Sequence, residues 1–543
     1  MAASLLSQAG VKAGDIGVRV SDKAEFKGFT SALGVAHFLG VQFARIPARF
    51  RQAQLLSPES HSGVPPDHLR GVRQHLFAGA PAANLAQSEY GCLCLNIYAP
   101  ASTVTSGEKL PVLVWIHGGG WTIENGNADF SGDFLVHHSV KKDKPIVFVS
   151  INYRMGSFGF LSSSELTEEA LSHGEAGWTN QGLNDQRLGL EWVKNYIHLF
   201  GGDGSNVTIA GESAGAWSVL AHLRSDQPLC RRGILQSAPS WSMMKPSAAQ
   251  AKFDQLVQSA GISPTATAAE KIAALRSASP EDLIAWNGPL TSPNWDSKWF
   301  VGHASPEAPL DCAEPFPTWV QAVVSGTMRD ELSVFGLDKL WSTKASVLSS
   351  LRNLLSLPGD PSFCSEVLAE YGIQDDSLDV VAVRAFGSIL ADACFSRVPF
   401  NLADACSPSN NSASPSLYIY RFDQHDEEES SVLNGAAFHT LDNAYVSRYP
   451  AVAGPAAPIS CQTTADLFSQ MILRLSYGEA PWQAYGDLGA QNVFDGAHTR
   501  LETVDRGAQR WRKLLTNEDR VNRFARLFYD MLNQSPRGEG EGP

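Results

Sequence analysis

The sequence has 543 residues, 43% of them hydrophobic and 18% charged, and its formal net charge is −14. This composition is typical of a globular protein, and the negative charge argues against nucleic acid or an acidic membrane surface as a partner. No window is apolar for long enough to form an integral membrane segment, and the N-terminus lacks a secretory signal pattern, so we expect a cytoplasmic protein.

The first third of the chain alternates apolar strands with irregular segments. We predict short strands between residues 17 and 51, then a long connection from 52 to 90, which is typical of a lid or a mobile surface loop. Further strands are predicted at 93–98, 111–116 and 146–152, with a polar turn at 101–109. The strand at 111–116 is apolar throughout, which indicates burial on both faces of a central strand.

The remainder alternates helical and strand patterns. Helices are predicted at 183–197 and 501–532, strands at 206–210, 323–325 and 417–422, and helical insertions at about 247–300 and 341–397. Alternating strands and helices indicate an α/β fold with a large, mostly parallel sheet and helices on both faces. We expect a single domain over residues 1–535, followed by a disordered tail at 536–543.

The cysteines and metal motifs exclude several classes of site. Eight cysteines are too few for a disulfide scaffold in a chain of this length, so we expect reduced, buried thiols. The spacing of Cys92 and Cys94 fits no common zinc pattern, and the sequence has no HExxH, Walker or dinucleotide-binding motif. We therefore expect neither a metal nor a cofactor.

One turn, Gly211-Glu212-Ser213-Ala214-Gly215, lies between the strand at 206–210 and a helix-compatible stretch. Strand, sharp turn and helix are the context of the G-x-S-x-G nucleophile elbow. Small residues flank Ser213 because the turn is strained and the strand and helix approach closely. The pattern predicts that Ser213 is a nucleophile; the alternative is a Gly-rich helix start with an idle serine.

A second glycine-rich segment, His117-Gly118-Gly119-Gly120-Trp121, follows the strand at 111–116. Successive glycines let the backbone approach a ligand closely and direct N–H groups into a site. HGGG is the oxyanion-hole loop that accompanies a nucleophile elbow in lipases and esterases. Alone it would indicate a plain strand exit, but beside the elbow it predicts an oxyanion hole.

A catalytic serine needs a histidine base and a carboxylate that orients the histidine, in the chain order Ser, acid, His. The histidines after Ser213 are His222, His303, His425, His439 and His498. His439 follows the strand at 417–422 through a loop, the expected place, although an ordinary histidine is an equal alternative. Asp330 and Glu331 stand together beyond a short strand, and the residues alone leave both open as the acid.

Seven short motifs recur together in one known family. They are 93–98 (LCLNIY), 117–120 (HGGG), 152–154 (NYR), 182–186 (GLNDQ), 200–203 (FGGD), 211–215 (GESAG) and 236–237 (QS). On these motifs the chain resembles the type-B carboxylesterase/lipase family, the cholinesterase-like branch of the α/β-hydrolases. Weaker matches near 325–335 and 417–446 extend the resemblance over most of the chain.

The resemblance implies a serine esterase that acts on a small-molecule carboxylic ester. Its catalytic set would be the nucleophile Ser213, the acid Glu331 in preference to Asp330, and the base His439. The resemblance assigns the oxyanion-hole N–H groups to Gly119, Gly120 and Ala214. It makes Glu212 a buried carboxylate beside the nucleophile, and it places Ser237 and Asp442 where the family steadies the histidine loop. For those two, a plain turn or helix residue is an equal alternative.

The chain also departs from the family pattern. Secreted members pair a cysteine at the position of Cys92 with an earlier one, but no cysteine precedes Cys92 here, which favours an intracellular protein. Residues 51–90 contain no Trp, so a quaternary-ammonium substrate is not expected. Trp121 and Trp241 are candidate pocket walls, with core packing as the alternative. Two other functions use the same fold: acyl transfer in a biosynthetic pathway, and non-catalytic binding.

Overall fold

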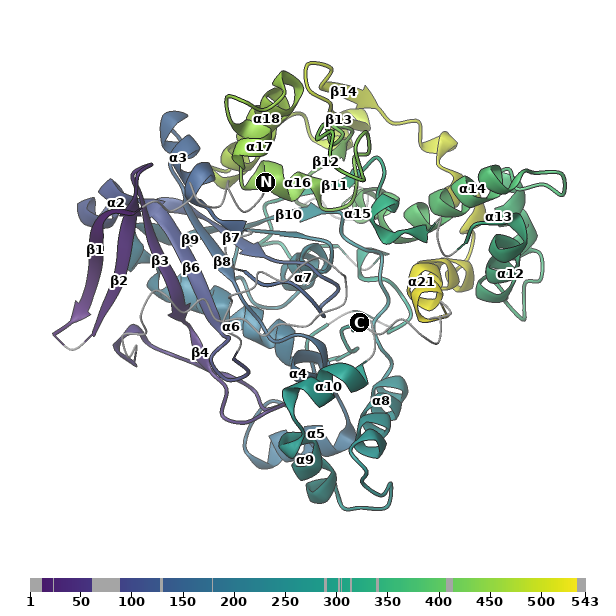
Figure 1. Cartoon of the computed structure of the whole chain (residues 1–543), viewed down its shortest axis with the longest axis horizontal. Coiled ribbons are helices and arrows are strands. Elements are labelled where there is room, and N and C mark those ends of the chain that lie inside the picture. Colours follow the sequence, from purple (N-terminus) through teal and green to yellow (C-terminus); the bar gives the residue numbers. More distant parts are fainter. Residues whose placement is uncertain are drawn as a thin grey trace.

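A sheet of twelve strands crosses the computed structural model (Figure 1). The structure describes residues 12–22, 24–60, 88–126, 130–177, 179–287, 291–300, 303, 305–312, 315–337, 341–406 and 414–534. In spatial order the strands are β1 (Lys12–Ser21), β2 (Ala24–Ser31), β3 (Val35–Gln42), β6 (Cys94–Pro100), β8 (Val147–Ile151), β7 (Leu110–Ile116), β9 (Gly202–Glu212), β10 (Arg232–Gln236), β11 (Ala322–Met328), β12 (Ser416–Phe422), β13 (Ala490–Phe494) and β14 (Arg500–Thr503). A separate ribbon pairs β4 (Ala44–Arg45) with β5 (Gln54–Leu55).

The sheet is parallel in its centre and antiparallel at both ends. Strands β8, β7, β9, β10, β11, β12 and β13 pair in parallel. The strands β1, β2, β3 and β6 and the edge strand β14 pair antiparallel. Parallel neighbours need crossover connections, which explains the helices between these strands. The carboxyl ends of β9, β10, β11 and β12 consequently meet at one edge of the sheet.

The central strand β7 shows why the sheet has a core on each face. All seven of its residues are buried. Val112, Val114 and Ile116 join one hydrophobic cluster, while Leu113 and Trp115 join the other. Alternate side chains of a strand point to opposite faces, so an uninterrupted apolar run packs on both.

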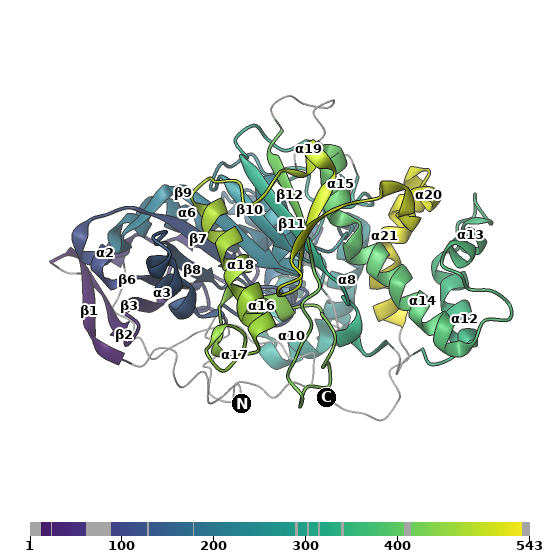
Figure 2. The ribbon, with the colours of Figure 1, turned by 90° about the horizontal axis from the view of Figure 1, so that it is seen from above.

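Helices cover both faces of the sheet (Figure 2). One face packs against α3 (Asp133–Lys141), α16 (Leu441–Val446), α17 (Pro450–Ala453) and α18 (Ile459–Ser476). The larger cluster on the other face includes α6 (Gln181–Tyr196), α7 (Ala214–Leu223) and α21 (Glu518–Gln534). The shorter helices include α4 (Gly156–Phe160), α5 (Ser164–Ser172), α19 (Tyr485–Leu488) and α20 (Arg510–Leu514). No helix in the described ranges is both long and apolar enough to cross a membrane.

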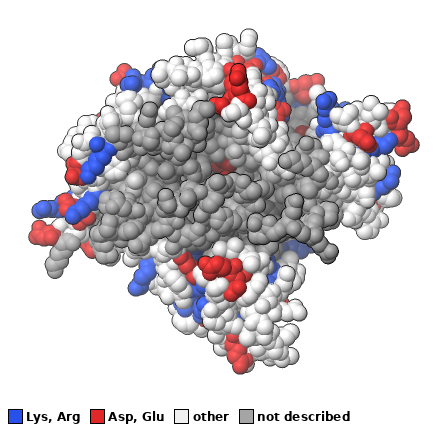
Figure 3. All heavy atoms as spheres, in the orientation of Figure 1, with Lys and Arg blue, Asp and Glu red and all other residues white. Residues whose placement is uncertain are grey.

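Two helical segments extend away from the sheet in Figure 1. The first contains α8 (Pro246–Ser259), α9 (Ala268–Ser277) and α10 (Pro280–Asn287). The second contains α12 (Lys344–Leu354), α13 (Phe363–Glu370) and α14 (Asp379–Ala391). The π-helical turn η6 (Asp392–Ser396) then leads to α15 (Val398–Ala405), which contacts β11 and β12 of the sheet. Within the predicted insertion at 247–300, the last described helix ends at residue 287, and the described residues 291–300 contain no helix. On the face drawn in Figure 3, described acidic and basic residues are interspersed rather than segregated.

The mostly parallel α/β architecture predicted from the sequence is confirmed, but two local predictions are wrong. The expected turn at 101–109 contains the helix α2 (Ala101–Ser106), which Gly107 ends in the left-handed conformation at φ 77°. The expected helix at 501–532 begins as the edge strand β14, because Leu501 pairs with Asn492 of β13. Most of the predicted 52–90 loop, residues 61–87, and the whole 536–543 tail lie outside the described residues.

The packing around the G-x-S-x-G turn gives a stability prediction. A Cβ at Gly215 would overlap the carbonyl oxygen of Ile116, so Gly215→Ala should lower the free energy of unfolding by about 1–3 kcal/mol or more. Gly387 in α14 has open space around its Cβ position, so Gly387→Ala should be neutral or stabilise by up to about 1 kcal/mol. Urea unfolding of both variants measures the difference, and equal effects would contradict this account of the turn.

Candidate active site

Ser213 stands at the junction of β9 and α7 in a strained backbone conformation. Its φ of 54° and ψ of −124° are unusual for a residue with a side chain. The N–H of Ser213 donates to the carbonyl of Gln236 at 2.9 Å, which ties the turn to β10. Added Cβ atoms at Gly211 and Gly118 would lie 2.6 Å from Gly215 and 2.7 Å from Glu212, respectively. Glycine is therefore required where β9, α7 and the loop after β7 converge.

Glu331 and His439 form a buried pair just beyond β11. The Oε2 atom of Glu331 lies 2.6 Å from Nδ1 of His439, and both side chains are at least 95% buried. The Oε1 atom accepts two further hydrogen bonds, each 2.8 Å long, from the Ser237 hydroxyl and the Met328 N–H. With its oxygens occupied in this way, Glu331 holds the proton of His439 on Nδ1 and leaves Nε2 as the basic nitrogen.

Asp330, the other carboxylate that the residues alone left open, contacts different groups. Its backbone N–H donates to the carbonyl of Ala437 at 2.9 Å, and its Oδ2 accepts from the Ala437 N–H at 2.8 Å. Its carboxylate also pairs with Arg329 at 2.7 Å. Asp330 thus fastens the loop that carries His439, while its neighbour Glu331 contacts the imidazole.

Ser213 and His439 line one cavity of about 320 Å³. The other lining residues are Gly119, Gly120, Trp121, Thr122, Ile123, Glu124, Glu212, Ala214, Pro239, Trp241, Val334, Phe335, Phe395, Thr440, Phe528 and Leu532. The structure describes both Ser213 and His439, and the Ser213 hydroxyl forms no hydrogen bond to His439. The Nε2 atom of His439 lies 3.0 Å from Oε1 of Glu212 instead, in an approach not aligned as a hydrogen bond. Catalytic hydrogen bonds often tighten only when substrate binds.

Two carboxylates control the charge of the imidazole. Burial alone would lower the pKa of His439, but the negative charges of Glu212 and Glu331 outweigh it and raise the pKa to about 9. Burial raises the pKa of Glu212 well above its ordinary value, although His439 acts in the opposite direction. The charge of Glu212 and the charge of His439 therefore influence each other's protonation.

Three residues that line the same cavity, Gly119, Gly120 and Ala214, carry the backbone N–H groups predicted for the oxyanion hole. Gly119 and Gly120 have φ values of 80° and 60°, and Ala214 is the first residue of α7. Within the described part of the chain, no group accepts a hydrogen bond from the N–H of any of the three. The carbonyl of Gly119, in contrast, accepts from the N–H groups of Thr122 and Ile123 at 3.0 Å each. The arrangement offers donors to an anionic oxygen beside Ser213.

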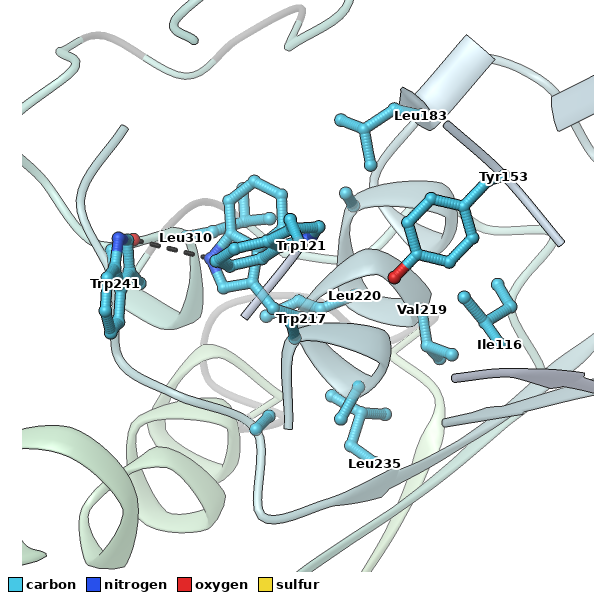
Figure 4. Close-up of a cluster of buried hydrophobic side chains, with 14 of the residues drawn as sticks. Ile116, Trp121, Tyr153, Leu183, Trp217, Val219, Leu220, Leu235, Trp241 and Leu310 are labelled. Atoms are coloured by element: carbon cyan, nitrogen blue, oxygen red, sulfur yellow. Dashed lines mark hydrogen bonds between the residues drawn. The ribbon is translucent and has the colours of Figure 1, made fainter. Parts of the chain in front are cut away.

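The predicted pocket walls Trp121 and Trp241 both line the cavity and also pack in the core. Their ring centroids are 6.0 Å apart, and Trp217 lies 5.4 Å from Trp121 (Figure 4). The indole N–H of Trp217 donates to the carbonyl of Trp241 at 3.4 Å, the dashed line in Figure 4. Trp121 and Trp241 therefore line the cavity and pack in the core at the same time.

Three phenylalanines of the site were missed by reasoning from the sequence. Phe395 and Phe335 pack against His439 with centroid distances of 4.7 and 5.7 Å, and Phe528 lies 5.1 Å from Phe335. Phe335 follows Glu331 by four residues, and this closeness along the chain could have identified it as a residue of the site. Phe395 and Phe528 come from a helical insertion and the C-terminal helix, where no motif marks them.

The remaining predicted residues lie close behind the pair. Ser237 contacts Glu331 as described, and Asp442 is fully buried and accepts a 3.0 Å hydrogen bond from Tyr420. Burial raises the pKa of Asp442 to about 6. Of the other candidate histidines, His222 contacts Gln186 at 3.0 Å, and neither it nor the rest line the cavity.

The sheet, the elbow and the loops at its carboxyl edge define an α/β-hydrolase. A solved structure of EstA from Aspergillus niger matches this fold with a TM-score of 0.71 and 23% identity, over 92% of this chain and 98% of that one. The sequence model of the carboxylesterase family matches residues 22–475, so the chain belongs to that family. The fold class and the family predicted from the sequence are both confirmed.

Curated relatives match over part of their length. Lipase 1 of Geotrichum candidum is 39% identical over 228 residues, which is 40% of this chain and 38% of the lipase. VdtD of Byssochlamys spectabilis, an inactive carboxylesterase-like protein, is 34% identical over 216 residues, which is 38% of this chain and 36% of that protein. The chain thus spans less than two fifths of the length of each of these relatives.

The adjacent carboxylates Asp330 and Glu331 provide a matched test. Glu331→Gln should lower kcat for a p-nitrophenyl ester by about 10²–10⁴, because an amide can present N–H to Nδ1 and favour the wrong tautomer. Asp330→Asn should stay within about threefold of wild type, since its Oδ can still accept from Ala437. Steady-state kinetics of the two variants, with melting temperatures as a folding control, measure the difference. Equal losses of kcat would contradict the role of Glu331 as the carboxylate that orients His439.

The close approach of Glu212 to Nε2 of His439 predicts a pH effect. A base must be neutral to act, so kcat/KM should rise with pH as His439 loses its proton. Glu212→Gln removes one negative charge but keeps the burial, so the pKa of His439 should fall and the rising limb should move about 1–3 units to lower pH. The pH dependence of kcat/KM at fixed ionic strength measures the shift. A limb that stays in place would show that Glu212 does not act on the imidazole.

Proposed function

We propose that the protein is a serine carboxylic ester hydrolase that uses Ser213, His439 and Glu331 and forms an acyl-enzyme intermediate. One observation carries the proposal: the strained Ser213 and the imidazole oriented by Glu331 line a single cavity. Membership of the carboxylesterase family and the likeness to a lipase support the same class of reaction. The substrate is a small-molecule ester.

In the first half-reaction, the Ser213 hydroxyl turns toward Nε2 of His439 and attacks the acyl carbon as the imidazole takes its proton. The carbonyl oxygen becomes an anion that accepts hydrogen bonds from Gly119, Gly120 and Ala214 N–H. Each such donor contributes about 10²–10³ in rate. Glu331 stabilises the imidazolium, which then protonates the leaving alcohol.

In the second half-reaction, a water molecule takes the place of the alcohol. His439 removes its proton, the water attacks the acyl carbon and the carboxylic acid leaves as Ser213 regains its hydrogen. Glu212 lies against Nε2, on the side where these protons move. A carboxyl beside the imidazole modulates both steps through the charge of His439.

Acyl transfer and non-catalytic binding are the two alternatives to hydrolysis. Acyl transfer would use the same residues with an alcohol or amine in place of water, and product analysis with added acceptors separates it from hydrolysis. Non-catalytic binding is the other candidate, and one relative, VdtD, is named as an inactive carboxylesterase-like protein. The complete set of Ser213, His439 and Glu331 in this chain favours catalysis. The cytoplasmic location and the single-domain organisation expected from the sequence stay predictions.

Removal of the nucleophile tests the proposal directly. Ser213→Ala should reduce hydrolysis of p-nitrophenyl butyrate by at least about 10³ and abolish labelling by a fluorophosphonate probe, because no other residue supplies the attacking oxygen. Ser172, exposed on α5, provides the control: Ser172→Ala should keep both signals. Wild-type protein that neither hydrolyses esters nor reacts with the probe would support a binding protein, and unchanged turnover in Ser213→Ala would refute the assignment.

A further inference from the structure

We propose that the C-terminal helix α21 forms a wall of the substrate pocket, and that Phe528 and Leu532 limit the length of the hydrocarbon chain that the enzyme accepts. The inference rests on the proposed ester hydrolysis and adds a determinant of specificity. It assigns this role to the last described helix, about 300 residues beyond the elbow in the sequence.

Side chains of α21 reach the cavity that holds Ser213. Phe528 and Leu532 both line it, and they lie four residues apart, on one face of the helix. Phe528 is only 3% exposed. Phe524 is one turn earlier and fully buried, but it does not belong to the residues that line the cavity. Only the final turns of α21 therefore contact the space where substrate binds.

Phe528 connects the other walls of the pocket. Its ring centroid lies 5.1 Å from Phe335, 6.1 Å from Phe395 and 6.4 Å from Trp241. These three residues follow β11, belong to η6 and follow β10, respectively. Since Phe335 and Phe395 also pack on His439, Phe528 belongs to an aromatic wall of the cavity that contacts the imidazole through these two rings.

Ion pairs at the start of α21 fix the position of this wall. Arg520 is 7% exposed, and its guanidinium contacts Asp360 at 2.5 Å and Glu366 at 2.6 Å. It also donates to the carbonyl of Leu514 at 3.0 Å. This arginine ties the start of α21 to α13 and to the residue Asp360 that precedes α13. An apolar wall discriminates chain lengths, since one methylene changes kcat/KM by about 10–200-fold in such a pocket.

Chain-length series test the inference. We would measure kcat/KM for p-nitrophenyl esters of two to twelve carbons and for butyrate esters of alcohols of increasing length. Phe528→Ala enlarges the cavity and should raise the ratio of long-chain to short-chain kcat/KM at least about tenfold in one series. Leu532→Trp fills the cavity and should lower the same ratio at least about tenfold. The series that responds identifies the part of the ester that lies against α21.

Phe524→Ala is the matched control, because it removes an equal ring from the same helix without opening the cavity. It should lower the melting temperature as Phe528→Ala does, yet leave the ratio within about twofold of wild type. Should Phe528→Ala not fold, Leu532→Trp at its half-buried position decides alone. Ratios unchanged in folded Phe528→Ala and Leu532→Trp would overturn the inference while esterase activity stands. An inert wild type would instead refute the proposed function, and the inference with it.

Discussion

The buried contact between Glu331 and His439 is the constraint on which the site depends. A carboxylate at 1% exposure is costly to bury unless its oxygens are hydrogen-bonded. Glu331 meets this requirement with three donors: His439, the Ser237 hydroxyl and the Met328 N–H. Each donor comes from a different segment, namely the exits of β10, β11 and β12. The pair can therefore exist only when these segments are assembled side by side.

The sheet register supplies that assembly. β10 pairs in parallel with β11 so that Gln236 faces Gly326, and β11 pairs with β12 so that Met328 faces Phe422. Parallel strands in this register end together, so the loops that follow them begin within reach of one another. Asp330 then fastens the histidine loop through two hydrogen bonds to Ala437. The pairing of these strands thus determines where the imidazole lies.

The polar half of the site could be predicted from the sequence because local geometry limits which residues fit. Only glycine suits positions 211 and 215, where a Cβ would meet neighbouring backbone, and so the elbow leaves a readable pattern. The choice between Asp330 and Glu331 could not be made from the residues, because it depends on which side chain turns inward after β11. Leu501 was assigned to a helix for a related reason: its partner Asn492 on β13 is a tertiary contact.

The apolar half of the site obeys a different rule, which explains why sequence reasoning missed it. Hydrogen-bonded groups need particular atoms at particular distances, whereas a hydrophobic wall needs only volume, which many side chains supply. Phe395 and Phe528 reach the cavity from η6 and α21, and nothing in their neighbours along the chain distinguishes them from core residues. In the function that we propose, the sheet edge carries the groups of the reaction, while helices outside the sheet form the apolar wall that contacts the ester.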